Sequence, residues 1–320
     1  MQRKQRFAQH EVLISCIVPA YNEVAGIEVF LREFHAKLKQ LKQPFEIIVI
    51  DDGSKDNTSI VIEKLIAEYP DEIKLLSFSR NFGKEIALTA GLEHCRGDLA
   101  ILIDADFQHP FEVIQQFLSH WVEGYDMVYG VRNDRKDETW TKRLFSKFFY
   151  WLIGISTNVP IPADAGDFRL LDRAMINAIV DCKERDRFMK GLYAWVGFKS
   201  IAVPIDVQER KTGKSSWRFL KLTKLALTGI TSFSNLPLQV WGVVGLMISA
   251  IALIYAICVV LKTLISGVDV PGYATIVVAI MFFGGIQLLS IGILGEYIAK
   301  IFNEVKKRPL YIASKKIGFN

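Results

Sequence analysis

The pattern of hydrophobic and polar residues changes at about residue 234. Before it, short apolar runs rich in β-branched residues end in polar residues and alternate with segments of helical periodicity. The apolar runs lie at 12–18, 46–51, 73–79, 99–104 and 126–132, and the helical segments at 24–40, 57–69, 83–95 and 110–124. This alternation predicts an α/β fold with a mostly parallel sheet, whose ligands bind outside the carboxyl ends of the strands.

The second part of the chain contains two uncharged runs that are long enough to cross a bilayer. No charged residue lies between Lys224 and Lys262, and the next uncharged run covers 270–295. About 20 apolar residues span the hydrocarbon core, so we predict a transmembrane hairpin at 235–299 with spans at about 236–261 and 273–295. Cationic residues flank its inner ends: Lys214, Arg218, Lys221 and Lys224 before it, and Lys300, Lys306, Lys307 and Arg308 after it.

The charge asymmetry predicts the topology and the partners. The outer loop carries only Lys262 and Asp269, which places both termini in the cytoplasm. Residues 1–234 then form a cytosolic domain and 300–320 a basic cytosolic tail. The net charge of +5 comes from clusters beside apolar helices rather than from a nucleic-acid motif. We therefore expect membrane lipids, and no nucleic acid, as partners.

Two segments near 141–155 and 215–233 combine lysine and arginine with large apolar residues. Such a combination is typical of helices that lie in the membrane interface. Ordinary domain helices packed on the sheet are the alternative.

Polar residues gather where the predicted strands end. Asp104 and Asp106 lie two residues apart, so their carboxylates can converge on a divalent cation, and the alternatives are helix capping and solvation. Asp51 and Asp52 suit hydrogen bonds to a nucleoside, or they cap the helix that begins near residue 57. Lys84 follows a strand in a position that suits a phosphate or a solvated turn. Neither GxGxxG nor GxxxxGK[ST] is present, which disfavours dinucleotide and P-loop chemistry.

Several longer motifs together carry a family resemblance. They are VPAYNE, DDGSKDNT, SRNFGKEIALTAGL, DADFQHP, AGDFRLLDR, RFMKGLYAWVG and GEYIAKIFNEVKKRPLY. With these motifs the chain resembles family 2 glycosyltransferases of the GT-A fold, a Rossmann-like α/β fold. Within that family it looks most like the polyprenyl-phosphate glycosyltransferases, which include bactoprenol glucosyltransferases and dolichol-phosphate mannose synthase.

The resemblance implies roles for individual residues. Asp167 matches the position of the catalytic base, with Asp164 as a nearby competitor, and Asp106 is the first choice as metal ligand. Mg²⁺ or Mn²⁺ would be held by Asp104, Asp106 and Gln108. The nucleotide sugar would be bound by Pro19, Tyr21, Glu23, Asp51, Asp52, Lys84, Asp104, Ala105 and Arg132.

The implied reaction is inverting transfer of a hexose, glucose from UDP-glucose, to undecaprenyl phosphate. It would occur at the cytoplasmic face of a bacterial inner membrane and give a β-linked lipid sugar for lipopolysaccharide, O-antigen or cell-envelope modification. A UDP-aminoarabinose derivative, UDP-GlcNAc and GDP-mannose are alternative donors, and a non-catalytic lipid-carrier component is the alternative class. Similar enzymes form tetramers through their membrane regions, so the resemblance offers a homotetramer as the candidate assembly.

One motif departs from the family pattern. Ser216 stands where the resemblance leads us to expect a phosphate-binding lysine. Lys214 and Arg218 are the nearest candidates to supply that cation. Arg210, Lys214 and Arg218 are the residues expected at the lipid phosphate or in the loop that closes over it.

Overall fold

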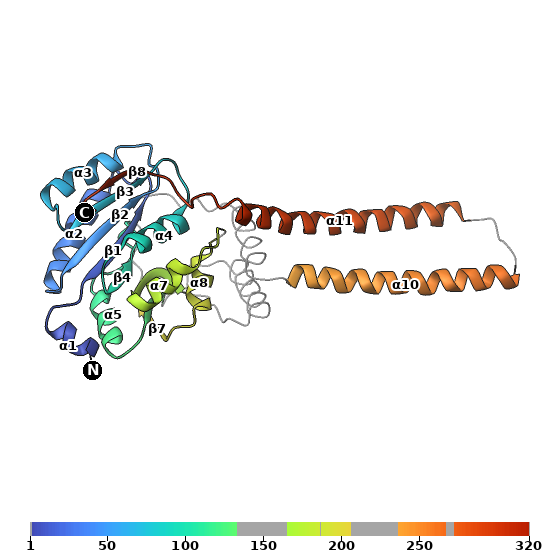
Figure 1. Ribbon diagram of the computed structural model, residues 1–320, viewed down its shortest axis with the longest axis horizontal. Coiled ribbons are helices and arrows are strands. Elements are labelled where there is room, and N and C mark those ends of the chain that lie inside the picture. The colour runs from blue at the N-terminus through green and yellow to red at the C-terminus, as the bar shows by residue number, and fades with distance from the viewer. Residues whose placement is uncertain (1, 133–164, 186, 206–235, 267–271, 320) are drawn as a thin grey trace.

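The described residues of the computed structural model, 2–132, 165–185, 187–205, 236–266 and 272–319, form a three-layer domain and a helical hairpin (Figure 1). They contain one sheet of eight strands in the order β7-β5-β6-β4-β1-β2-β3-β8. The strands are β1 Ile14–Ala20, β2 Phe45–Asp51, β3 Ile73–Phe78, β4 Leu99–Leu102, β5 Met127–Arg132, β6 Ala165–Asp172, β7 Ser200–Ile205 and β8 Ala313–Ile317. Strands β6 and β8 run antiparallel to their neighbours, and the other pairs are parallel. The predicted α/β fold with a mostly parallel sheet is confirmed.

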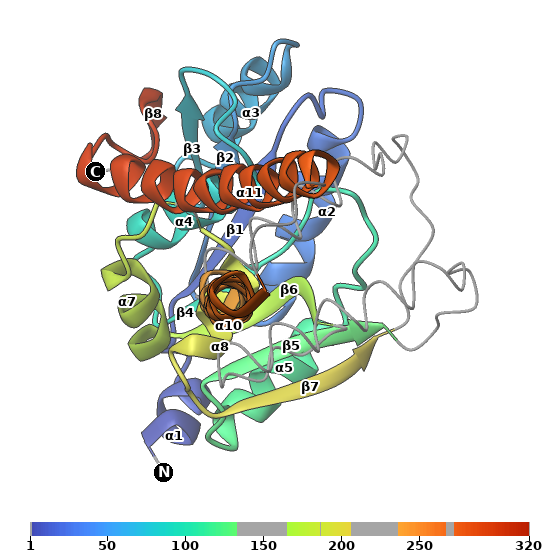
Figure 2. The same ribbon diagram turned by 90° about the vertical axis from the view of Figure 1, so that its right-hand side faces the viewer.

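Helices cover both faces of the sheet. The helices of the domain are α1 Gln2–Ala8, α2 Ile27–Gln40, α3 Thr58–Glu68, α4 Lys84–His94, α5 Val113–Val122, α7 Arg173–Asp181 and α8 Met189–Trp195. Helices α2, α3 and α5 pack against one face and α4, α7 and α8 against the other (Figure 2). Alternate residues of β2 point to opposite faces of the sheet. Ile47 packs in the core that includes α2, α3 and α5, and Ile48 packs in the core that includes α4, α7 and α8.

The predicted strands and helices agree with the structure in existence and order, with shifted ends. Strand β1 runs to Ala20 rather than residue 18, so Pro19 lies inside the strand. Strands β6 and β7 and helices α1, α7 and α8 were not predicted, because charged residues interrupt the apolar residues of β6 and α1, and β7, α7 and α8 are short elements of six to nine residues.

The segment predicted as a basic tail contributes a strand to the domain. Strand β8 pairs with the edge strand β3, and Ser79 N–H donates to the carbonyl of Ile312 over 2.9 Å. The ring of Tyr311 stacks on Phe78 with centroids 4.8 Å apart, and its hydroxyl donates to Glu93 over 2.8 Å. This strand was not predicted, because its two lysines leave no apolar run in the sequence. Lysine is nevertheless common in exposed edge strands.

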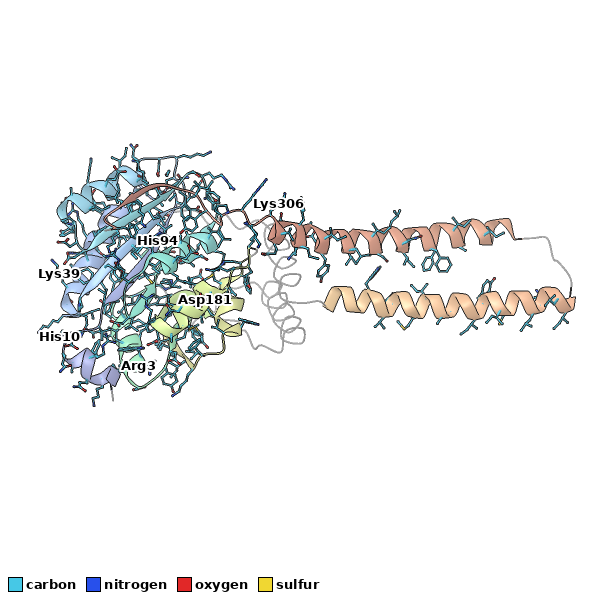
Figure 3. All side chains as sticks on the ribbon, in the orientation of Figure 1. Arg3, His10, Lys39, His94, Asp181 and Lys306 are labelled. Carbon is cyan, nitrogen blue, oxygen red and sulfur yellow. The ribbon has the colours of Figure 1, made fainter. Side chains whose placement is uncertain are left out.

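The hairpin helices, α10 Leu236–Ser266 and α11 Tyr273–Val305, extend together away from the domain (Figure 1). The indole N–H of Trp241 donates to the hydroxyl of Ser290 and so joins them. Helix α11 continues past the predicted end at 295, because Glu296, Lys300 and Glu304 are spaced by four residues and end the apolar run without ending the helix. Lys306 follows α11 beside the domain (Figure 3).

Within the described part of the chain, one segment, Phe282–Val305, is both long and apolar enough to cross a membrane. Apolar side chains on both helices are exposed, for example Ile251 and Leu288 at 66% and 72%. The segments 141–155 and 215–233, predicted as interfacial helices, lie outside the described residues.

Candidate active site

Two loops at the carboxyl ends of β2 and β3 are tied together by a buried carboxylate. Asp52 accepts hydrogen bonds from the N–H groups of Phe82, over 2.6 Å, and Gly83, over 2.9 Å. Gly53, which follows Asp52 in the loop after β2, has φ +67°. A Cβ at this position would lie 2.3 Å from the carbonyl carbon of Arg80. Only glycine allows this close approach of the two loops. Burial raises the pKa of Asp52, and the two N–H groups oppose that shift.

The loop after β1 is joined to the same region. The N–H of Asn22 donates to Ser54 Oγ over 2.9 Å, and Lys55 N–H donates to Asn22 Oδ1 over 2.8 Å. Glu23 N–H donates to Thr58 Oγ1 over 2.9 Å. The structure therefore brings Pro19, Tyr21 and Glu23 beside Asp51 and Asp52, with the ring of Tyr21 exposed.

Neither Asp51 nor Asp52 caps α3, which was the structural alternative. Asp51 Oδ1 accepts from the N–H of Ser54 over 3.0 Å. The first turn of α3 is held instead by Asp56, which accepts from the N–H of Thr58 over 3.0 Å. The paired aspartates thus shape the loops at the sheet edge.

Lys84 joins two carboxylates from different strands. Its Nζ lies 2.7 Å from Asp104 Oδ2 and 2.6 Å from Asp167 Oδ2. The sheet explains the meeting, because β6 runs antiparallel to β4 with Leu102 opposite Arg169. Continuing that register by two residues sets Asp104 opposite Asp167. Lys84 is therefore an ion-paired residue and not part of a solvated turn.

This ion-pair cluster favours the charged forms of Lys84 and Asp167. Burial acts to raise the pKa of Asp167, but the ammonium groups of Lys84 and Lys190 outweigh it and hold that pKa at about 2. Burial acts to lower the pKa of Lys84, but Asp104 and Asp167 raise it above its ordinary value. All three side chains keep some surface open, 27% for Asp104, 32% for Asp167 and 40% for Lys84. At neutral pH Asp167 is a carboxylate with one oxygen bound to a cation.

The residues proposed for a metal lie directly after β4. Asp106 is half-buried, and its Oδ1 accepts the N–H of Gln108 over 3.1 Å across a turn in which Phe107 has φ +57°. No group of three acidic, histidine or cysteine side chains that could hold a metal occurs among the described residues. Mg²⁺ and Mn²⁺ suit one or two carboxylates completed by phosphate oxygens. Asp104 and Asp106 fit such a shared site, whereas the side chain of Ala105 packs in the core.

The remaining predicted site residues lie at or beyond the described part of the chain. Arg132 ends β5 at the border of the described residues. Asp164, Arg210, Lys214, Ser216 and Arg218 lie outside them.

A buried cation two residues after Asp167 was not predicted from the sequence. Arg169 is 2% exposed, and its guanidinium lies 4.2 Å from the ring centroid of Tyr193. Its Nε donates to the carbonyl of Gly166 over 3.1 Å, which holds the strand that carries Asp167. The signal was present, because residues two apart on a strand share a face.

Comparisons with known proteins identify the family of the chain. The model of glycosyl transferase family 2 matches residues 15–180, and that of the GtrB C-terminal hairpin matches 236–301. A glycosyltransferase of Synechocystis sp. is 48% identical over 94% of each chain. A prophage bactoprenol glucosyl transferase homolog of Escherichia coli is 44% identical over 94% of this chain and 98% of its own. The bactoprenol glucosyl transferase of Shigella phage SfII is 44% identical over 94% and 97%.

Among solved structures, glucosyl-3-phosphoglycerate synthase from Mycobacterium tuberculosis, in complex with Mn²⁺, UDP-glucose and phosphoglyceric acid, is 19% identical with a TM-score of 0.47. That alignment covers 70% of this chain and 79% of the synthase. The matches to the two family models and the similarity to full-length relatives lead to one conclusion. The chain is a glycosyltransferase of family 2 that carries a GtrB C-terminal hairpin.

Proposed function

We propose that this enzyme transfers glucose from UDP-glucose to undecaprenyl (bactoprenol) phosphate, with inversion at the anomeric carbon. The observation that carries the proposal is the cluster of Lys84, Asp104 and Asp167, which lies next to the loops suited to a nucleotide. Relatives named bactoprenol glucosyl transferase align with 94% of the chain and support the choice of lipid and sugar.

The acceptor explains why the site can work with a weak base. A phosphate monoester has its second pKa near 6 and is mostly dianionic at pH 7, so its oxygen needs no deprotonation before it attacks. Asp167, whose pKa lies at about 2, suits a positioning and electrostatic role. A direct attack by the phosphate oxygen on the anomeric carbon of an α-linked donor would give a β-linked product.

The donor would lie across the three loops. The nucleoside would contact Pro19, Tyr21, Glu23, Asp51 and Asp52, and the sugar diphosphate would reach Lys84, Ala105 and Arg132. A Mg²⁺ or Mn²⁺ ion held by Asp106, with Asp104 and Gln108, would neutralise charge on the diphosphate leaving group.

The membrane arrangement is part of the same proposal. Residues 1–234 would be a cytosolic domain, and the hairpin at 235–299 would cross the bacterial inner membrane twice with both termini cytoplasmic. The exposed apolar surfaces of α10 and α11 and the apolar segment Phe282–Val305 support it. Arg210, Lys214 and Arg218 would then lie near the lipid phosphate, and a homotetramer is the proposed assembly.

The test is transfer of labelled sugar from a panel of UDP- and GDP-sugars to undecaprenyl phosphate by the purified full chain with Mg²⁺ or Mn²⁺. We expect labelling from UDP-glucose, its loss with EDTA, and loss in Asp106→Asn but not in Asp71→Asn, an exposed acid outside the site. The anomeric proton coupling of the product reports its configuration. An α-linked product, or full activity of Asp106→Asn, would overturn the proposal.

A further inference from the structure

A lysine that no part of the proposed function uses acts electrostatically on Asp167. Lys190 is in the first turn of α8, between two residues that fix its position. The N–H of Met189 donates to Glu85 Oε2 over 2.9 Å, and Glu85 directly follows Lys84 in the chain. Three residues after Lys190, Tyr193 packs under the guanidinium of Arg169 on the strand of Asp167. The turn that carries Lys190 is thus anchored to Glu85, next to Lys84, and to Arg169, on the strand of Asp167.

The ammonium group of Lys190 belongs to the same electrostatic cluster. Burial lowers its pKa, the carboxylate of Asp167 opposes that shift, and the charges of Arg169, Glu85 and Lys84 also act on it. The side chain is half-buried, and no ion pair or hydrogen bond joins its Nζ to another of the residues the structure describes. An ammonium group in such a place is stabilised by an anion that supplies oxygen acceptors.

Other described cations near the carboxylates are already engaged. Lys84 is shared between Asp104 and Asp167. Arg169 is 2% exposed, and its guanidinium packs over the ring of Tyr193. Arg80 lies over the ring of Phe82 at 4.0 Å, in the loop on the nucleotide side. A dianionic acceptor entering next to Asp167 therefore meets Lys190 as the available donor in this part of the structure.

We propose that Lys190 binds the phosphate group of the lipid acceptor and holds its attacking oxygen beside Asp167. This inference rests on the proposed function, from which it takes the acceptor. Phosphate oxygens also occur in the donor diphosphate, so the test must separate the two sources. A lysine suits the role because its three donors can follow a phosphate that moves toward the sugar.

The experiment measures binding of undecaprenyl phosphate, undecaprenol and UDP to the full chain in detergent. It compares the wild type with Lys190→Gln, Lys190→Arg and Lys183→Gln. Lys183 is an exposed lysine before α8 and provides the same loss of charge outside the site. We expect Lys190→Gln to bind undecaprenyl phosphate about 10- to 100-fold more weakly, the range of one charge-assisted hydrogen bond. Its affinities for undecaprenol and UDP should stay unchanged, and Lys190→Arg should recover most of the loss.

Three results would overturn the inference. The first is equal binding of undecaprenyl phosphate by Lys190→Gln and Lys183→Gln. The second is a parallel loss of UDP affinity, which would assign Lys190 to the donor or to folding, and the third is a wild type that binds the phosphate no better than the alcohol. Failure of the proposed function is distinct, since it appears as absent sugar transfer in a wild type that still binds the lipid phosphate.

Discussion

The contact between Gly53 and Arg80 predicts a sharp effect of one added methyl group. Gly53→Ala places alanine at φ +67°, in the left-handed region that costs an L residue about 1–2 kcal/mol. Its Cβ would also lie 2.3 Å from the carbonyl carbon of Arg80. Non-bonded carbon atoms prefer about 3.5 Å or more, so the two loops must separate by about 1.2 Å.

That separation acts on the hydrogen bonds of Asp52. The bonds to the N–H groups of Phe82 and Gly83 now span 2.6 and 2.9 Å, and a further displacement of about 1 Å would break at least one. A bond to a charged group is worth about 1.5–3 kcal/mol, with the lower value fitting a partly exposed loop. We expect the site to lose about 2 kcal/mol of preorganisation, which is about a 30-fold weaker affinity for UDP.

Calorimetric titration with UDP and thermal unfolding would measure the two effects separately. Gly197→Ala is the matched control, because Gly197 has φ +73° and its added Cβ would meet only a carbonyl oxygen at 3.9 Å. It should lose a similar conformational energy of about 1 kcal/mol and bind UDP like the wild type. Equal UDP affinity of the two variants would refute the reasoning that close loop contact forms the nucleotide site.

Three further predictions concern charge, metal and the sheet edge. Lys84→Met should raise the pKa of Asp167 from about 2, because Lys190 then opposes the effect of burial without the ion-paired Lys84. The wild-type rate already falls at acid pH as the acceptor phosphate, with its second pKa near 6, is protonated. In Lys84→Met the protonation of Asp167 should make this acidic limb steeper, whereas a profile unchanged from the wild type would contradict the assignment. Removal of divalent metal should abolish sugar transfer and leave the thermal unfolding midpoint of the UDP-free enzyme unchanged, and added Mn²⁺ should restore transfer. Tyr311→Ala should lower the free energy of unfolding by about 2 kcal/mol in urea titrations, because it removes the ring stacked on Phe78. Tyr311→Phe keeps that ring and should lose less than about 1 kcal/mol, so equal losses would show that the stacking contributes little.

The sequence predicted the elements that follow simple periodicity. The central strands are buried on both faces and appear in the sequence as apolar runs, and each is followed by a helix, of which α2 and α5 are clearly amphipathic. Strand β6 was not predicted from this pattern, because Asp167, Arg169 and Asp172 interrupt its apolar residues. Its pairing with β4 across a long chain separation could not be derived from local pattern.

The candidate site was predicted only in part, because the sequence shows where the central strands end but not how β6 pairs with β4. Residues at the ends of β1, β2 and β4 were expected to meet, since parallel strands end at one edge. The ion pairs of Lys84 depend on the antiparallel register of β6, so the sequence could not indicate that Lys84 bridges Asp104 and Asp167. Motif resemblance supplied Asp167 itself, while its buried neighbour Arg169 required the fold.

The position of β8 in the sheet has a consequence for how the protein is made. The chain completes β3 early in synthesis, but β8 follows α11 and is translated only after the whole hairpin. Until then the edge of β3 exposes unpaired backbone groups, the kind of edge that templates aggregation. Completion of the sheet therefore waits for synthesis of the whole hairpin. Under the proposed membrane arrangement, a delay in inserting the hairpin would prolong the stage at which the incomplete sheet needs a chaperone.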